Sequence, residues 1–146
     1  MDAIIVDLDG TLCKSQHVDA FTDVGGKVDW SAWMETNAFA TVNEWCRQIV
    51  LGAQAMGTKI IFLTARTGSE QGVRITDGWL KNNGFMNYEL IMRTENDYRP
   101  DNIIKMEIYN TRIMPYYNTL FAIDDKRRVV DMWRTAGVPA LHCADY

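Results

Sequence analysis

Three short apolar runs, each followed at once by polar side chains, constrain the fold of this chain more than any other feature. The runs are residues 3–6, 59–63 and 120–123. Runs of this length, rich in Ile, Val, Leu and Phe, predict buried β-strands. The polar residues that follow them are Asp7 and Asp9, Thr64 and Arg66, and Asp124 and Asp125.

Between these runs, apolar residues recur at spacings of three and four, which predicts amphipathic helices. A first helix is expected from about Ala38 to a cap at Gly57, and its inward face is Val42, Trp45, Cys46, Ile49, Ala53 and Met56. A second closes at Asn83-Gly84 and has as its inward face Val73, Thr76, Trp79 and Leu80. A third is expected to begin at Asp101, whose side chain can cap it. A fourth stops at Gly137 and contains Val129, Val130, Trp133 and Ala136.

Two weaker strands, residues 89–92 and 139–143, complete an alternation of strands and helices. This order predicts a mostly parallel sheet covered by helices on both faces, a three-layer α/β/α Rossmann-like fold. Ligands of such folds bind beyond the carboxyl ends of the strands, so we expect the three polar pairs to meet in one site.

At 146 residues the chain fits one domain, and we expect a single domain over residues 1–146. Residues 13–37 are polar and are interpreted as a small cap-like insertion after the first strand. Within it, Trp30 and Trp33 can either stack on a nucleobase or pack inside the insertion.

The composition excludes broad attraction to polyanions. With 15 basic and 19 acidic residues and a net charge of −4, the chain has no general affinity for nucleic acid or an anionic membrane. A polynucleotide would therefore be held locally. The three cysteines, Cys13, Cys46 and Cys143, have no metal-type spacing, which favours a reducing cytoplasm. No secretion signal or membrane-spanning run is found, and no feature predicts an obligate protein partner.

The segment 7–11, Asp-Leu-Asp-Gly-Thr, places two carboxylates directly after a buried strand. Neighbouring carboxylates are unfavourable there unless a cation compensates their charge. A divalent ion held by Asp7 and the Asp124-Asp125 pair would do so, and oxygen-only ligands suit Mg²⁺. One carboxylate can then attack phosphorus to form an acyl phosphate, while a second protonates the leaving oxygen. Gly10-Thr11 permits a tight turn whose N–H groups can face an anion.

Four further residues can act around a phosphate. The hydroxyl of Thr64 can donate a hydrogen bond to the transferring group, and Lys105 can neutralise charge on it. Asp101 lies one helical turn before Lys105 and can orient it. Arg66 is interpreted as a two-pronged phosphate ligand. Cys13, His17 and His142 are expected to have no catalytic role.

These residues together resemble the motifs of the haloacid dehalogenase (HAD) superfamily. The first motif is matched by residues 7–12, the second by Thr64, the third by Lys105 and the fourth by Asp124-Asp125. The second acid of the first motif is typical of the phosphatases in that superfamily. The resemblance narrows to the 3′-phosphatase half of phage-type polynucleotide kinase, through Thr64-Ala65-Arg66, Arg99-Pro100-Asp101, and residues 122–127 and 129–134.

The resemblance implies removal of 3′-phosphate from DNA or RNA ends, or from nucleotides, with Mg²⁺ as cofactor. It implies Asp7 as nucleophile and Asp9 as acid/base. The groups that it implies around the phosphate are Gly10, Thr11, Thr64, Ala65, Arg66 and Lys105, with Asp101 orienting the lysine. The metal ligands that it implies are Asp7, the Asp9 carbonyl, Asp124 and Asp125.

Two departures from the family keep other functions open. No Gly-x-x-x-x-Gly-Lys-Ser/Thr loop occurs in the 146 residues, so 5′-phosphorylation is not expected. The family also tends to place an arginine where this chain has Gln16-His17-Val18. The alternatives are a HAD phosphatase for another small-molecule phosphate ester and a non-catalytic binding module with the same fold.

Overall fold

The computed structural model describes residues 1–14 and 18–144, so Gln16 and His17 lie outside the described residues. Its strands are β1 (Asp2–Val6), β2 (Lys59–Thr67), β3 (Glu89–Arg93), β4 (Asn118–Asp124) and β5 (Ala140–His142). Its α-helices are α1 (Trp30–Thr36), α2 (Glu44–Ala55), α3 (Glu70–Asn82), α4 (Asp101–Ile108) and α5 (Arg127–Thr135). Short helical turns are η1 (Asp19–Phe21) and η2 (Asn37–Phe39), and a π-helical turn, η3 (Tyr109–Ile113), continues α4.

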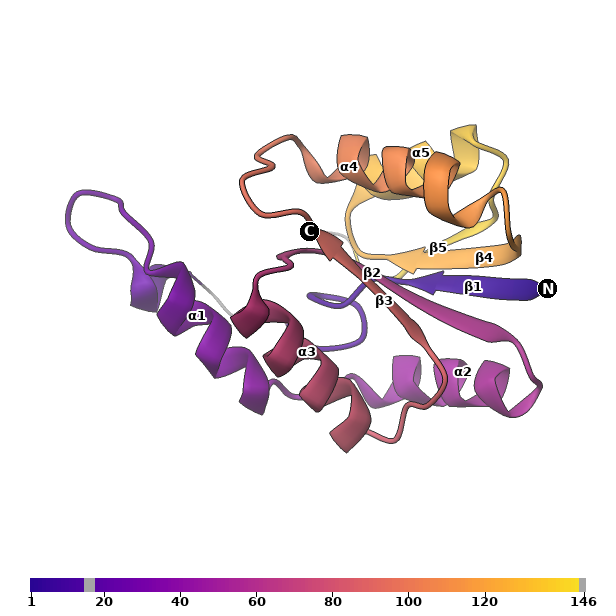
Figure 1. The fold of residues 1–146 in the computed structure, drawn as a ribbon, viewed down its shortest axis with the longest axis horizontal. Coiled ribbons are helices and arrows are strands. Elements are labelled where there is room, and N and C mark those ends of the chain that lie inside the picture. The colour runs from indigo at the N-terminus through magenta and orange to yellow at the C-terminus, as the bar shows by residue number, and fades with distance from the viewer. Residues whose placement is uncertain (15–17, 145–146) are drawn as a thin grey trace.

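The five strands form one parallel sheet in the order β3-β2-β1-β4-β5. Strand β1 is central, since Ile5 is opposite Ile61 of β2 and Ala122 of β4. Helices α4 and α5 cover one face, and α2 and α3 cover the other (Figure 1). The expected three-layer α/β/α fold with a mostly parallel sheet is confirmed.

The protein has a hydrophobic core on each face of the sheet, and β1 contributes side chains to both. It can do so because successive side chains of a strand point to opposite faces. Ile4 and Val6 pack with Cys46 of α2 and other residues of the α2–α3 layer. Ala3 and Ile5 pack in the α4–α5 layer with Val129 and Trp133, among others. The polar residues after β1 are therefore carried by a strand that is anchored on both faces.

Helix α2 begins later than expected and buries only part of the expected face. Residues just before it are held extended by hydrogen bonds to the loop after β1, from the backbone N and Nδ2 of Asn43 to Leu12 O (2.7 Å) and Thr11 O (2.8 Å). The helix therefore starts at Glu44 and not near Ala38. Its buried residues are Cys46 and Val50, whereas Trp45, Ile49 and Met56 of the expected face are exposed.

Three other local expectations were wrong in detail. Val73 of α3 is exposed, and Ile75 takes a buried position there instead. The N-cap of α4 is Pro100, and Asp101 is the first residue of the helix. Strand β2 continues through Arg66 to Thr67, because an irregularity in its pairing with β3 lets the ladder extend past Thr64.

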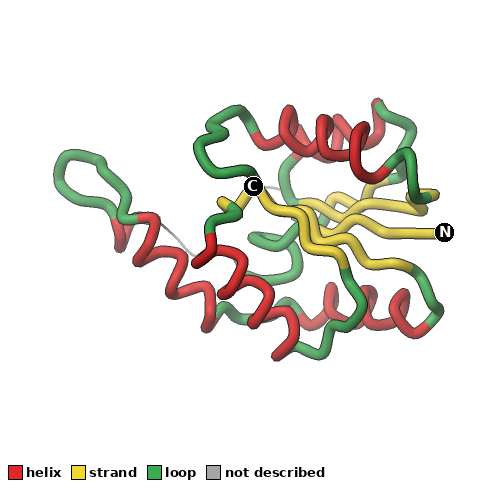
Figure 2. The backbone as a smooth tube through the Cα atoms, in the orientation of Figure 1, coloured by secondary structure: helices red, strands yellow, loops and turns green. Residues whose placement is uncertain are grey.

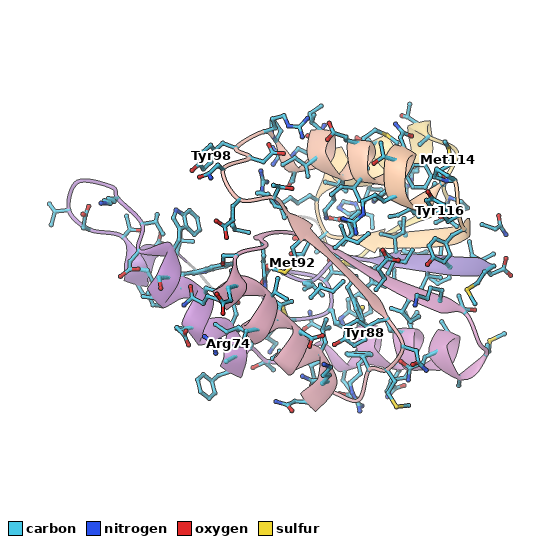
Figure 3. All side chains as sticks on the ribbon, in the orientation of Figure 1. Arg74, Tyr88, Met92, Tyr98, Met114 and Tyr116 are labelled. Atoms are coloured by element: carbon cyan, nitrogen blue, oxygen red, sulfur yellow. The ribbon has the colours of Figure 1, made fainter. Side chains whose placement is uncertain are left out.

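The insertion after β1 is small and rests on α3. Its loop and α1 project beyond the end of the sheet (Figures 1 and 2). Arg74 of α3, labelled in Figure 3, donates to Glu35 of α1 at 3.2 Å, and Gln71 donates to the same carboxylate at 2.9 Å. Trp30 and Trp33 contact each other edge to face, with ring centroids 5.7 Å apart. No helix among the described residues has the length and apolar character needed to cross a bilayer.

Candidate active site

The expected polar residues meet at the carboxyl ends of the three central strands. Asp7 follows β1, Thr64 and Arg66 lie near the end of β2, and Asp124 ends β4. All four side chains are buried. Burial of so many polar groups is costly unless each is paired, and their partners define the chemistry of the site.

Lys105 lies at the centre of the acidic cluster. Its Nζ donates to Asp7 Oδ1 at 3.0 Å and to Asp124 Oδ2 at 2.6 Å, and the residue is 3% exposed. Burial by itself would lower the pKa of Lys105, but the Asp7 and Asp124 charges outweigh it, so the pKa lies above its ordinary value. The ammonium is therefore held in its charged form between two acids.

Asp7, Asp124 and Asp125 form a buried carboxylate cluster in which one oxygen of each lies within 4.8 Å of the others. Burial first, and then the nearby Asp7 carboxylate, raises the pKa of both Asp124 and Asp125. Three carboxylates against the single ammonium of Lys105 leave excess negative charge. Oxygen-only ligands, burial and this excess charge together fit a hard divalent cation such as Mg²⁺.

Asp9 and Arg66 form a second pair beside this cluster. Arg66 Nε donates to Asp9 Oδ2 at 2.8 Å, and Nη2 donates to Asp9 Oδ1 at 2.7 Å, the two-pronged geometry of a strong charge-assisted pair. The Arg66 side chain is 2% exposed and that of Asp9 is 25% exposed. In this structure the two-pronged donor of Arg66, which the sequence predicted for phosphate, pairs with Asp9, because the turn after β1 lies beside the end of β2.

Thr64 and Ala65 lie next to this pair on β2. Thr64 Oγ1 accepts from the Arg66 backbone N–H at 3.1 Å, which leaves the hydroxyl hydrogen uncommitted by that bond. The Ala65 carbonyl accepts from Arg93 Nε at 2.9 Å. The Thr64 hydroxyl can therefore still donate to a phosphate oxygen, as expected. The Ala65 carbonyl is instead bonded to the side chain of Arg93 on the neighbouring strand β3.

The Gly10-Thr11 turn is closed on itself and does not present the N–H groups that were expected to face an anion. The Gly10 N–H donates to Cys13 O at 2.9 Å, and the Thr11 N–H donates to Leu8 O at 3.0 Å. Thr11 contributes its side chain instead, since Oγ1 donates to Asp7 Oδ2 at 2.9 Å. The turn thereby orients Asp7.

Gly10→Ala is expected to lower the melting temperature more than Gly57→Ala. Both glycines have φ +83°, but a Cβ at Gly10 would lie 2.3 Å from Asp125 Oδ2, whereas one at Gly57 meets nothing within 4 Å. Gly57→Ala therefore isolates the left-handed backbone cost, about 1–2 kcal/mol, and Gly10→Ala adds displacement of Asp125. Thermal denaturation of the two variants checks this. An equal loss in both would contradict a tight contact between the turn and Asp125.

Asp101 does not hold Lys105 as expected. Its Oδ2 accepts from Lys126 Nζ at 2.8 Å and its Oδ1 from Arg128 Nε at 2.7 Å. Burial raises the pKa of Asp101, but Arg128 and Lys126 outweigh it and hold the pKa well below its usual range. The reason for the difference is the close approach of the N-terminus of α5, with its cap Lys126, to the start of α4, which the spacing of residues within α4 could not show.

Three residues that accept hydrogen bonds from Arg66 were not among the site residues predicted from the sequence. Arg66 Nη1 donates to Thr76 Oγ1 at 3.2 Å, and Nη2 also donates to Asn37 Oδ1 at 3.3 Å and to Cys13 Sγ at 3.6 Å. Burial first, and then the Asp9 charge, raises the pKa of Cys13, which fits a thiol that stays protonated. The sequence contained one indication of these partners. Thr76 is a polar residue on a helix face that is otherwise apolar.

The chain is similar to known proteins over its whole length. Residues 1–146 match the family model described as the polynucleotide kinase PNKP phosphatase domain. A protein of Autographa californica nuclear polyhedrosis virus, whose name describes a bifunctional polynucleotide kinase/RNA ligase, is 28% identical over 148 residues, or 99% of this chain and 20% of that protein.

Two solved structures are similar over nearly the whole chain. A chain of the Pnkp1/Rnl/Hen1 RNA repair complex superposes with a TM-score of 0.80 at 30% identity, covering 98% of this chain and 42% of its own length. A chain from another structure of the Pnkp1/Rnl/Hen1 complex has a TM-score of 0.80 at 31% identity, with coverages of 99% and 47%. The chain thus spans less than half the length of each of these relatives.

Proposed function

This chain belongs to the family of polynucleotide kinase PNKP phosphatase domains, and we propose that it is a Mg²⁺-dependent phosphatase that removes 3′-phosphate from nucleic-acid ends. The observation that carries the proposal is the buried group of Asp7, Asp124, Asp125 and Lys105 at the carboxyl ends of the central strands. We treat the 146 residues as one catalytic domain.

In the proposed reaction, an oxygen of Asp7 attacks phosphorus, and the bond from phosphorus to the 3′ oxygen breaks. Asp9, in its protonated form, gives a proton to that leaving oxygen, so the products of the first step are a 3′-hydroxyl end, phospho-Asp7 and the Asp9 carboxylate paired with Arg66. Asp9 then takes a proton from water as the water attacks phosphorus. Inorganic phosphate leaves, and both acids return to their starting forms.

Lys105, Thr64 and Arg66 support these steps in different ways. Lys105, which donates to Asp7 Oδ1, aims the nucleophile and offsets its charge. Thr64 has a hydroxyl hydrogen for a phosphate oxygen. Arg66 donates to both carboxylate oxygens of Asp9. Because a carboxylate has about four acceptor positions, this pairing leaves the remaining positions for the substrate.

Asp7, Asp124 and Asp125 would hold the metal ion, with the Asp9 carbonyl as a further ligand. When bound, Mg²⁺ supplies charge neutralisation at the carboxylates and polarises a phosphate oxygen. The excess negative charge of the cluster and the raised pKa of Asp124 and Asp125 support this assignment.

Phosphate release from matched oligonucleotides tests the proposal. The substrates are a 3′-phosphorylated DNA and RNA oligonucleotide, the same sequences phosphorylated at the 5′ end, and a set of sugar phosphates, each with Mg²⁺ or with chelator. We expect release from the 3′ end only with Mg²⁺. Faster turnover of sugar phosphates would move the substrate to small molecules. No turnover of any phosphomonoester by folded protein would favour a binding module.

A further inference from the structure

Asn37 connects the insertion after β1 to the Asp9–Arg66 pair. Its side chain is fully buried and lies where α1 ends and η2 begins. The carboxamide uses both of its ends, because Oδ1 accepts from Arg66 Nη2 at 3.3 Å and Nδ2 donates to Trp33 O at 3.0 Å. The insertion and the acid/base pair are thus joined through one side chain.

We propose that Asn37 is a positioning residue for the reaction, acting through Arg66 to keep Asp9 aimed at the leaving oxygen. The inference rests on the proposed phosphatase function and on Asp9 as its acid. It assigns the insertion a role in the chemistry of proton transfer.

The N–H donors of Arg66 are shared between Asp9 and neutral side chains. A guanidinium has five N–H donors in a rigid plane, and each of its three nitrogens already has a partner among the described residues. Two nitrogens hold Asp9, at 2.8 and 2.7 Å. Thr76 of α3 accepts from Nη1 on one side, and Asn37 accepts from Nη2 on the other. Cys13 Sγ also accepts from Nη2, at 3.6 Å. These three neutral acceptors set the plane of the guanidinium, and the guanidinium sets the plane of the Asp9 carboxylate.

Loss of Asn37 removes one of these acceptors without removing the ion pair. Arg66 would keep Asp9, but the pair could tilt about the bond to Thr76, because the sulfur of Cys13 is only a weak acceptor. A general acid that is misplaced transfers its proton less efficiently, and a misplacement of about 1 Å can cost about 100-fold in rate. Phosphate binding at Lys105 and Thr64 is untouched, so the loss should fall on proton transfer alone.

The leaving group separates this role from simple structural damage. An alkoxide leaving oxygen, such as the 3′ oxygen of a nucleotide, depends strongly on protonation, whereas p-nitrophenolate leaves readily without it. The value of kcat/KM covers only the steps through formation of phospho-Asp7. Comparing kcat/KM for a 3′-phosphorylated oligonucleotide and p-nitrophenyl phosphate therefore reports the acid role of Asp9.

We expect Asn37→Ala to lower kcat/KM for the oligonucleotide by about 10- to 100-fold and for p-nitrophenyl phosphate by less than about threefold. Thr36→Val is the matched control, because Thr36 Oγ1 donates to the same Trp33 carbonyl at 2.7 Å but has no bond to Arg66. This control should retain wild-type kcat/KM with both substrates.

Thr76 provides an independent variant should Asn37→Ala fail to fold. Thr76→Val removes the acceptor of Arg66 Nη1 with little change of shape and should reproduce the selective loss, and Thr76→Ser should restore activity. Equal losses with both substrates, or no loss with either, would overturn the inference while leaving the phosphatase proposal intact. A folded wild-type protein that cleaves no phosphomonoester would refute the phosphatase proposal, and this inference with it.

Discussion

Replacing Asp7 with asparagine is expected to reduce phosphate release from a 3′-phosphorylated oligonucleotide by about 10⁴-fold or more, since a carboxamide cannot form the acyl phosphate. Asparagine has nearly the same shape as aspartate and keeps an oxygen to accept from Lys105 or Thr11. The fold should therefore survive. The measurement is single-turnover phosphate release, with circular dichroism to verify folding.

Two further observations sharpen the Asp7 experiment. Asp131→Asn, at an exposed position of α5, is the control for the same chemical change away from the site. Acid quenching of wild type during turnover should trap phosphate on the protein in a form that hydroxylamine releases, as for an acyl phosphate, and Asp7→Asn should trap none. Substantial turnover by folded Asp7→Asn protein would rule out Asp7 as the nucleophile.

Replacing Lys105 with methionine is expected to abolish activity and to destabilise the protein by about 3–5 kcal/mol, the cost of removing one partner from a buried ion pair. Lys105 is the ammonium that directly contacts both Asp7 and Asp124, at 3.0 and 2.6 Å. Without it, the buried carboxylates face one another uncompensated. Urea denaturation in the presence of chelator measures the loss directly.

Lys81→Met is the matched control for Lys105→Met. Lys81 pairs with Asp77 at 2.7 Å on the surface of α3, with its side chain 67% exposed. Surface pairs contribute at most about 1 kcal/mol, so the control should remain close to wild type. Mg²⁺ should also stabilise Lys105→Met more than wild type, because the added cation meets more uncompensated charge. Equal stability of the two lysine variants in chelator would contradict a central ion pair at Lys105.

Local patterns in the sequence were sufficient to predict the strands and the carboxylates that meet at their ends. A strand that is buried on both faces must be apolar throughout, so its end is visible where carboxylates begin, as at Asp7 after β1 and Asp124 of β4. In β2 the apolar run ends at Thr64, although the strand continues to Thr67. Parallel strands place those ends at one edge of the sheet. The convergence of these side chains, and the resemblance to a phosphatase family, could therefore be predicted from the sequence.

Helix boundaries and inward faces were predicted less well, because they depend on contacts with distant segments. Asn43 bonds to the loop after β1 and delays the start of α2. The same packing turns Cys46 and Val50 inward and leaves Trp45 exposed. Spacing alone predicts an apolar face but not which edge of that face meets the sheet.

The sequence by itself determined which polar residues meet at the carboxyl ends of the strands, and the tertiary structure decided which of them pair. Arg66 reaches Asp9, 57 residues away, and Asn37, 29 residues away, while Asp101 turns to Arg128, 27 residues away. An arginine or an aspartate has several possible partners at the mouth of such a site. Which partner such a residue pairs with depends on distances of a few ångströms, because charge-assisted hydrogen bonds form only at contact. Those distances arise from the packing of α1 on α3 and of α5 against the sheet, and only the folded chain contains them.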